Sequence, residues 1–461
     1  MPVRARGERP VTVVVMRRCF GNHCLSVDAH CHLPRTGTLF PALPSGLAWH
    51  LALALTGTYN TSIWYLRSWN LPPGTLPLPL LTATYNPLMS KILVAMSGGV
   101  DSTVAAALLL EQGHDLIGCF MRLGDTGEDV EIAGEAGEGV KLHHRGCCSI
   151  NDAGDARRVC DLLGIPFYAA NFKAEFSRIV NYFESEYHAG RTPNPCVRCN
   201  DWLKFGRLFE YAKAMGAERV ATGHHARITD VGGRPRLQRG HDYAKDQSYV
   251  LFGQSTERLG RMLLPVGTMT KAHVRQRARD MNLPTASKPD SMEICFVPDT
   301  DYAGLLRRRD GDKFSSGDII DDQGTVVGTH DGHQQFTIGQ RRGINIAFGE
   351  PRYVTAKDPR ANTVTIGTRE QLLSAGCTAG ESVWHIDPES DWLPCRAQVR
   401  AHGEPLPARV RATGNDTIDV EFAIPHDAVA PGQAVVCYQS DVVCCGGWIN
   451  RTLRADETFA S

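Results

Sequence analysis

The segment from Lys91 to Gly113 constrains the fold of this chain more than any other. It runs KILVAM, then SGGVDS, then TVAAALLLEQG. The first run is short, apolar and followed by a glycine-containing turn, which predicts a buried strand. The last run predicts a helix that ends at Gly113. A strand, a tight turn and a helix in this order form the first half of a β–α–β unit, which places helices on the faces of a parallel sheet.

The same alternation continues along the chain. Further strands are predicted at 115–121, 165–172 and 219–225, and further helices at 151–164, 173–190 and 201–216. The polar, Gly- and Glu-rich stretch at 124–139 predicts a mobile loop. The fold class is therefore α/β, with a parallel sheet covered by helices on both faces.

Later segments have a different character. A basic helix is predicted at 270–282, and from about residue 315 short β-rich runs alternate with Gly and Asp turns, which is typical of a small barrel or sandwich. Because 461 residues are too many for one domain of roughly 100–200 residues, we expect several parts. These are a leader or extension without structure (1–88), a nucleotide-binding domain (89–235), a small central domain (236–312) and a C-terminal β-rich, barrel-like domain (313–461).

The first 88 residues hold seven arginines and two acids, a net charge of +5, whereas the whole chain carries −1. The apolar run at 39–57 is interrupted by Pro41, Pro44, Gly46 and His50, so we expect no membrane span. A basic leader with few acids is consistent with an organellar transit peptide, which would place the protein in mitochondria. The favoured alternative is an upstream extension before a natural start at Met89. The 15 cysteines lack the density of a secreted disulfide scaffold, so we expect a reducing, cytoplasmic setting.

The turn SGGVDS is the first candidate for chemistry. Its two glycines allow successive backbone N–H groups to face one concavity, and the helix that follows adds partial positive charge. This predicts a site for the pyrophosphate of ATP, although the turn lacks the Lys of a Walker A loop. A glycine-rich turn with an Asp or Ser helix cap is the plainer alternative.

SGGVDS resembles the PP-loop of the N-type ATP pyrophosphatases, which adenylate an oxygen and release pyrophosphate. That resemblance implies ATP, with Mg²⁺, as a ligand. The implied ATP-binding residues are Ala95, Met96, Ser97, Gly98, Gly99, Val100, Asp101, Ser102, Met121 and Gly223.

Two cysteine-bearing loops narrow the family. GRTPNPCVRCN at 190–200 and SKPDSMEICF at 287–296, together with ATGH, KDQSY and IGQRRG, resemble the bacterial-type tRNA-specific 2-thiouridylases over about residues 89–449. The resemblance implies ATP-dependent 2-thiolation of the wobble uridine, by adenylation of the C2 oxygen and transfer of sulfur from a cysteine persulfide. It gives Cys199 as the nucleophile, Cys295 as the persulfide carrier, and a transient Cys199–Cys295 disulfide. The implied partners are the anticodon stem-loop of tRNA and a persulfide-donating sulfur carrier or cysteine desulfurase.

The resemblance also implies contacts with RNA. Asn194, Pro195 and Cys196 match the segment that contacts the target base, although many family members have Asp where this chain has Cys196, which leaves the general base open. The implied tRNA-binding residues are Lys245, Asp246, Gln247, His224, Arg400 and Gln433.

The cysteines permit other chemistry. Cys196 and Cys199 could form half of a zinc site with Cys147 and Cys148, or Cys196, Cys199 and Cys295 could hold a labile iron–sulfur cluster. We favour persulfide chemistry without a metal. Two other functions remain as alternatives: another PP-loop ligase or amidotransferase, which would not need Cys199 and Cys295, and a zinc-bearing RNA-binding module, which would not need SGGVDS.

Overall fold

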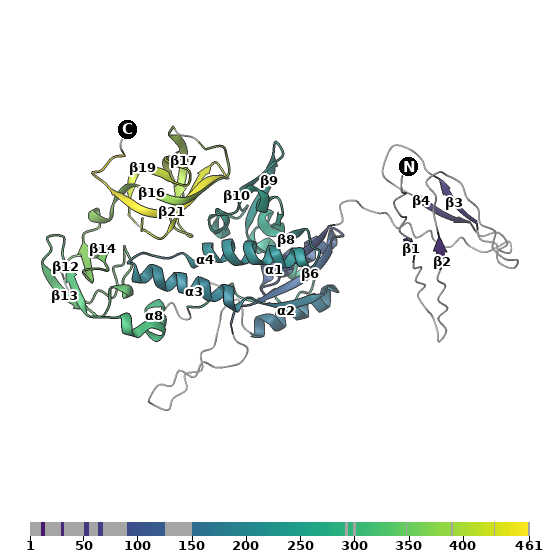
Figure 1. Ribbon diagram of the computed structural model, residues 1–461, viewed down its shortest axis with the longest axis horizontal. Helices are drawn as coiled ribbons and strands as arrows, with labels where there is room; N and C mark the ends of the chain where they lie inside the picture. Colours follow the sequence, from purple (N-terminus) through teal and green to yellow (C-terminus); the bar gives the residue numbers. More distant parts are fainter. Residues whose placement is uncertain are drawn as a thin grey trace, which may run out of the picture. The chain divides into compact units, whose positions relative to one another are not determined.

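The computed structural model describes residues 90–124, 150–290, 294–297, 301–346, 348–388, 391–427 and 429–459, and four short strands before them. The chain forms two units, Met1–Pro87 and Leu88–Ser461 (Figure 1). In the first unit β1 (Val11–Val13) pairs with β2 (Ala29–Cys31), and β3 (His50–Ala54) pairs with β4 (Ile63–Arg67). Within the described residues, no helix has the length and apolar character needed to cross a membrane.

A five-stranded sheet organises the first part of the second unit. Its order is β11-β8-β5-β6-β7, and every neighbouring pair is parallel. The strands are β5 (Lys91–Ala95), β6 (Asp115–Arg122), β7 (Phe167–Asn171), β8 (Arg219–Ala221) and β11 (Met262–Leu263). This confirms the predicted α/β fold.

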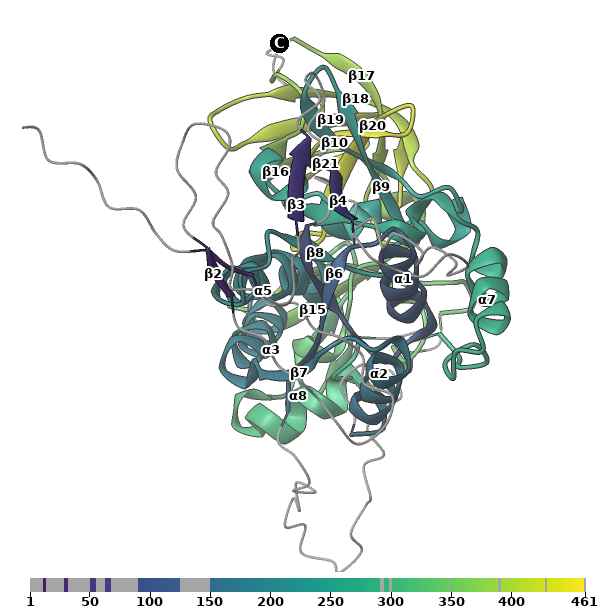
Figure 2. The same cartoon turned by 90° about the vertical axis from the view of Figure 1, so that its right-hand side faces the viewer.

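Helices cover both faces of this sheet because side chains alternate along a buried strand. Ile92 and Val94 pack with helices α1 (Val100–Glu111) and α2 (Ile150–Leu163). Leu93 and Ala95 point the other way and pack with α3 (Lys173–His188) and α5 (Leu208–Ala214). Figure 2 shows the sheet between these two helical layers.

The middle of the chain consists of short elements. A hairpin of β9 (Ala226–Val231) and β10 (Arg234–Arg239) leads into α7 (Lys271–Asp280) and later α8 (Tyr302–Asp310). The shorter helices are η2 (Tyr243–Lys245), η3 (Ser248–Leu251), α6 (Thr256–Leu259), η4 (Pro265–Thr268), η6 (Gly311–Lys313), η7 (His333–Gln335) and η8 (Glu370–Leu372). A four-stranded sheet of order β13-β12-β15-β14 follows. Its strands are β12 (Gly317–Ile320), β13 (Val326–His330), β14 (Tyr353–Asp358) and β15 (Thr363–Gly367).

The C-terminal part is a closed antiparallel barrel. Its strands are β16 (Ser374–Trp384), β17 (Leu393–Gln398), β18 (Leu406–Ala412), β19 (Ile418–His426), β20 (Ala434–Gln439) and β21 (Val442–Arg454). The order β16-β19-β18-β17-β20-β21 returns to β16 through a β16–β21 pairing, which removes the open edges. This confirms the predicted barrel. The β9–β10 hairpin extends the sheet beyond β21 and so joins the barrel to the first part of the chain (Figure 1).

Candidate active site

The turn at 97–102 has the shape that its glycines predict. Gly98 lies in the left-handed region at φ 73°, and a Cβ there would stand 2.4 Å from the carbonyl oxygen of Asp152. Gly99 is the N-cap of α1, and no side chain caps the helix. Because the first N–H groups of a helix have no partner within it, this end of α1 can bind an anion. The cradle suits phosphate oxygens, so the residues present fit ATP.

The other predicted nucleotide residues lie at the same edge of the sheet. Ser97 follows β5, Met121 is at the carboxyl end of β6, and Gly223 follows β8, the neighbour of β5 on its other side. A Cβ at Gly223 would stand 2.5 Å from the carbonyl carbon of Asp101 and from the nitrogen of Ser102, so only glycine lets this loop touch the start of α1. The carboxyl edge, where strand connections diverge, is the usual ligand site in such sheets.

Charged side chains surround the turn. Lys271 donates to Asp101 at 2.7 Å, and His225 Nε2 lies 3.1 Å from the same carboxylate. Burial raises the pKa of Asp101, but the hydrogen bonds and charges of His225 and Lys271 outweigh it and lower the pKa below its usual value. Asp101 is therefore an ionised carboxylate held by a lysine. Lys271 had no assigned role in the sequence, because it lies 170 positions from Asp101.

The loop that carries the first cysteine pair begins a helix. Asn194 caps this helix through Val197 N, and Pro195 occupies the first helical position, where a missing N–H costs nothing. Helix α4 (Pro195–Arg198) continues directly into the π-helical turn η1 (Cys199–Arg207) and α5. The expectation of a helix beginning just after Cys199, at residue 201, is wrong, because the Asn-Pro cap starts it six residues earlier, at Pro195. Cys196 is exposed in the first turn, and Cys199 is half-buried.

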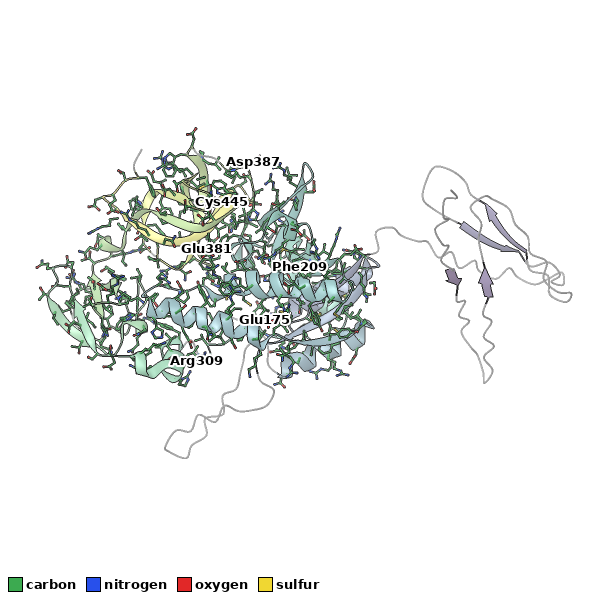
Figure 3. The ribbon with its side chains drawn as sticks, viewed as in Figure 1. Glu175, Phe209, Arg309, Glu381, Asp387 and Cys445 are labelled. Carbon is green, nitrogen blue, oxygen red and sulfur yellow. The ribbon has the colours of Figure 1, made fainter. Side chains whose placement is uncertain are left out.

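The barrel supports this loop. The side-chain amide of Gln433 donates to the carbonyl oxygens of Thr192 and Pro193 at 3.2 and 3.0 Å, and Asn194 Nδ2 lies 3.5 Å from Gln433 Oε1. On the next helical turn Arg198 pairs at 2.8 Å with Glu381. Figure 3 shows that Glu381 lies where the barrel faces the helices. Gln433 and the segment predicted to contact the target base, which were predicted separately, are thus in direct contact.

Cys199 and the residue that follows Cys295 pack on the same hydrophobic core. Cys199 and Phe296, the residue after Cys295, both lie against the core cluster that contains Ile179 of α3. Phe296 makes edge contacts with Phe176 and Phe183 of that helix, at centroid distances of 5.6 and 5.2 Å. Cys295 is half-buried, like Cys199. The segments that carry the two cysteines both contact α3.

The predicted tRNA-binding residues fall into two groups. Lys245 is on the surface and pairs with Asp290 at 3.0 Å. Arg400 is also exposed, and its guanidinium lies close to Gly339: a Cβ built on that glycine would stand 3.5 Å from an Arg400 nitrogen. Gln247 is exposed as well, whereas the side chain of Asp246 and His224 are buried. Asp246 is 5% exposed and pairs with Arg239, Gln247 accepts from His225 N at 2.8 Å, and His224 is 7% exposed. Burial holds the pKa of His224 well below its usual value, so this ring is neutral and does not favour a phosphate contact.

The described residues do not assemble a metal-binding set. Among them no group of three or more His, Cys, Asp or Glu side chains is arranged to hold an ion. Cys196, Cys199 and Cys295 therefore do not fit an iron–sulfur cluster here, and no step below uses one. Cys147 and Cys148, the other half of the alternative zinc site, lie outside the described residues.

Comparisons with known proteins agree with this arrangement. Residues 90–299 match the tRNA methyl transferase HUP domain family, 306–368 its PRC-barrel domain, and 374–449 the aminomethyltransferase β-barrel domain. The chain is 44% identical over 388 residues to the tRNA-specific 2-thiouridylase MnmA of Rhodopirellula baltica, covering 79% of this chain and 97% of that protein. It is 45% identical to MnmA of Carboxydothermus hydrogenoformans and 46% identical to MnmA of Chloroflexus aggregans, covering 79% of this chain and 98% and 99% of those proteins. The chain belongs to the tRNA-specific 2-thiouridylase family.

Proposed function

We propose that this protein is an ATP-dependent sulfurtransferase that replaces the C2 oxygen of the wobble uridine of tRNA with sulfur. One observation carries the proposal. Cys199 and the residue after Cys295 pack against one core cluster, in a unit whose parallel sheet also presents a phosphate cradle at 97–102. A PP-loop ligase that used ammonia would need the cradle but neither cysteine.

ATP is a co-substrate that makes the uridine oxygen a good leaving group. The C2 oxygen attacks the α-phosphorus, pyrophosphate leaves, and the oxygen can later depart as part of AMP. The N–H groups at the start of α1 are oriented toward developing phosphate charge, where Gly98 and Gly99 leave room for it. Mg²⁺ would enter with the ATP phosphates, its usual ligands.

Sulfur transfer needs two thiols. The terminal sulfur of a Cys295 persulfide bonds to C2, and the C–O bond breaks with loss of AMP. The Cys199 thiolate then attacks the Cys295 sulfur, and the electron pair of the broken S–S bond stays on the sulfur bound to C2. The products are 2-thiouridine and a Cys199–Cys295 disulfide, which a thiol reductant must reduce before the next turnover. A sulfur carrier or cysteine desulfurase would reload Cys295.

The tRNA would approach from the side of the exposed cations. Lys245 and Arg400 are proposed to contact phosphate or sugar, and the loop of Asn194, Pro195 and Cys196 to receive the base. Single-stranded anticodon bases can leave the stack and enter such a pocket. Gln433 then acts from behind the loop, through its bonds to Thr192 and Pro193.

Cys196 stands where many relatives have a carboxylate. The start of a helix favours a negative charge, and Cys196 is exposed in the first turn of α4. We propose that the Cys196 thiolate takes the proton that the uridine loses.

The test is direct. The purified protein is incubated with ATP, Mg²⁺, a persulfide donor and unmodified tRNA, and the digested nucleosides are analysed by mass spectrometry. We expect 2-thiouridine at the wobble position, and none when ATP is omitted. Folded protein that binds ATP and tRNA but yields no 2-thiouridine would refute the proposal.

A further inference from the structure

Lys288 has no role in the scheme above, yet its side chain reaches the phosphate loop. Its ammonium lies 3.0 Å from the carbonyl oxygen of Gly98, 2.5 Å from Asp152 Oδ1 and 2.6 Å from Asp155 Oδ2. Both aspartates belong to α2, on which Gly98 packs. Lys288 therefore links the phosphate loop to the neighbouring helix.

The positive charge of Lys288 balances the negative charges of Asp152 and Asp155. Burial lowers the pKa of Lys288, but its hydrogen bonds to Asp152 and Asp155 raise the pKa by more than burial lowers it. The pKa of Lys288 is therefore above its usual value. Burial raises the pKa of Asp155, and the bonds to Lys288 and Arg158 outweigh this and lower it. The site is thus one ammonium between carboxylates. Without that ammonium, two carboxylates would face the phosphates of ATP and repel them.

The segment of Lys288 also leads to Cys295. Arg275 of α7 donates to the carbonyl oxygen of Lys288 at 2.8 Å and to Asp290 at 2.6 Å. Asp290 also pairs with Lys271 at 2.9 Å, and Lys271 binds Asp101 of the phosphate loop. Residues 288 and 290 are therefore both joined to the phosphate loop. Cys295 follows Asp290 by five residues, which span about 18 Å at most when extended, so Cys295 cannot lie farther than that from this anchor.

We propose that Lys288 is a positioning residue of the thiolation reaction, which joins the phosphate loop to the segment that carries Cys295. Phosphates that enter the loop attract the ammonium. Because the same residue begins the segment that leads to Cys295, occupancy by ATP then changes the placement of that cysteine. The inference rests on the proposed role of Cys295 in sulfur transfer.

The first measurement follows the reactivity of Cys295 and needs neither tRNA nor a sulfur donor, and the second is the KM for ATP in the thiolation assay. The wild type and Lys288→Met are treated with iodoacetamide, with and without Mg²⁺-ATP, and labelling of the Cys295 peptide is followed by mass spectrometry. In the wild type we expect ATP to change the labelling rate by about fivefold or more. In Lys288→Met this response should vanish, and the KM for ATP in thiolation should rise about tenfold.

Arg158→Met is the matched control. It removes the other cation that pairs with Asp155, is on the surface, and does not touch Gly98. This variant should keep the response of Cys295 to ATP. Lys288→Arg, which retains a cation with several donors, should keep part of it.

Three results would overturn the inference. They are a wild type in which ATP leaves Cys295 labelling unchanged, a Lys288→Met variant that responds like the wild type, and an Arg158→Met variant that fails like Lys288→Met. If Lys288→Met does not fold, Asp155→Asn removes one of the two carboxylate charges that hold Lys288, and its response to ATP must be weaker than that of the wild type. Failure of the wild type to thiolate tRNA would be a separate result, against the proposed function.

Discussion

The side-chain amide of Gln433 donates to the carbonyl oxygen of Pro193 at 3.0 Å, across 240 positions of sequence. Gly432, the residue before Gln433, also lies close to this loop. It has φ 91°, and a Cβ there would stand 2.8 Å from the carbonyl oxygen of Thr192. The C-terminal barrel thus forms the back of the loop that is proposed to receive the target base.

Replacing Gln433 with Ala should loosen that loop. Two carbonyl oxygens lose their donor, which costs about 1–3 kcal/mol of stability when such groups are buried. We expect kcat/KM for tRNA to fall about tenfold or more, with ATP binding unchanged, as measured by steady-state thiolation and urea unfolding. Gln439→Ala is the matched control, since Gln439 makes one exposed bond, to Pro394 O. Equal behaviour of the two variants would contradict a role for Gln433 in shaping the loop.

The two glycines of the phosphate loop should differ in their tolerance of a methyl group. At Gly98 a Cβ meets Asp152 O at 2.4 Å and the backbone is left-handed, whereas at Gly99 the nearest atom is Ser97 Oγ at 3.4 Å. Gly98→Ala should therefore destabilise the protein by about 1–3 kcal/mol or more, and Gly99→Ala by much less. Thermal unfolding without nucleotide measures this. A larger loss in Gly99→Ala would show that the loop is held differently.

Cys199 and Cys295 should be needed for thiolation but not for the binding of ATP or tRNA. Cys199→Ser and Cys295→Ser should each abolish 2-thiouridine formation, because serine neither carries a persulfide nor resolves one. The affinities for ATP and tRNA, measured by calorimetry and filter binding, should stay within about threefold of the wild type. Cys395→Ser, in the barrel, serves as the control and should retain activity. Full thiolation by either site variant would remove the two-cysteine mechanism.

Cys196 should accept a carboxylate. Cys196→Asp restores the group that many relatives carry, and it is exposed in the first turn of a helix, where a negative charge is favourable. We expect this variant to keep activity and Cys196→Ala to lose about 100-fold in kcat, a typical loss for a general base. The pH–rate profile should differ between the wild type and Cys196→Asp if this residue transfers the proton, since a thiol and a carboxyl titrate differently. An unchanged profile in Cys196→Asp would exclude proton transfer by this residue.

Asp201 should make the protein less stable as the pH rises. Burial raises the pKa of this carboxyl to about 7, against the opposing effect of Arg198 and Arg258. Its pKa in the unfolded chain is about 3.9, so between about pH 4 and pH 7 the folded state keeps a proton that the unfolded state has lost. Stability contributed by this group is therefore present at low pH and lost as the pH rises through this window.

Asp201→Asn tests that sign. An amide keeps the oxygen that accepts from Gln254 at 2.6 Å and cannot ionise. The free energy of unfolding of this variant should exceed that of the wild type by nearly zero at about pH 4, and by at most about 4 kcal/mol above pH 7. Urea unfolding at the two pH values provides the measurement. A gain that is the same at both would show that Asp201 does not titrate in this range.

Much of the fold follows from local pattern. The runs at 91–96 and 115–121 are apolar, short and bounded by turns, and they form β5 and β6 because such residues need a fully buried sheet. The phosphate loop was predictable as well, because its glycines, the strand before it and the helix after it are contiguous. The helix start at Pro195 was not predicted, although an Asn-Pro pair is itself a start signal.

The residue types and spacing along the chain by themselves determined the alternating α/β sheet, the β-rich C-terminal part and the family of the enzyme, because each depends on side chains that are neighbours in sequence. Closure of the barrel depends instead on the pairing of β16 with β21, which are distant in sequence. Only the tertiary structure placed Gln433 behind Pro193, Lys271 on Asp101 and Lys288 on Gly98. These contacts span 170 to 240 positions, and a single polar side chain carries no periodic signal of its distant partner. They exist because burial of the apolar core fixes the relative placement of the segments, and the polar groups then bond with whatever that placement brings within reach.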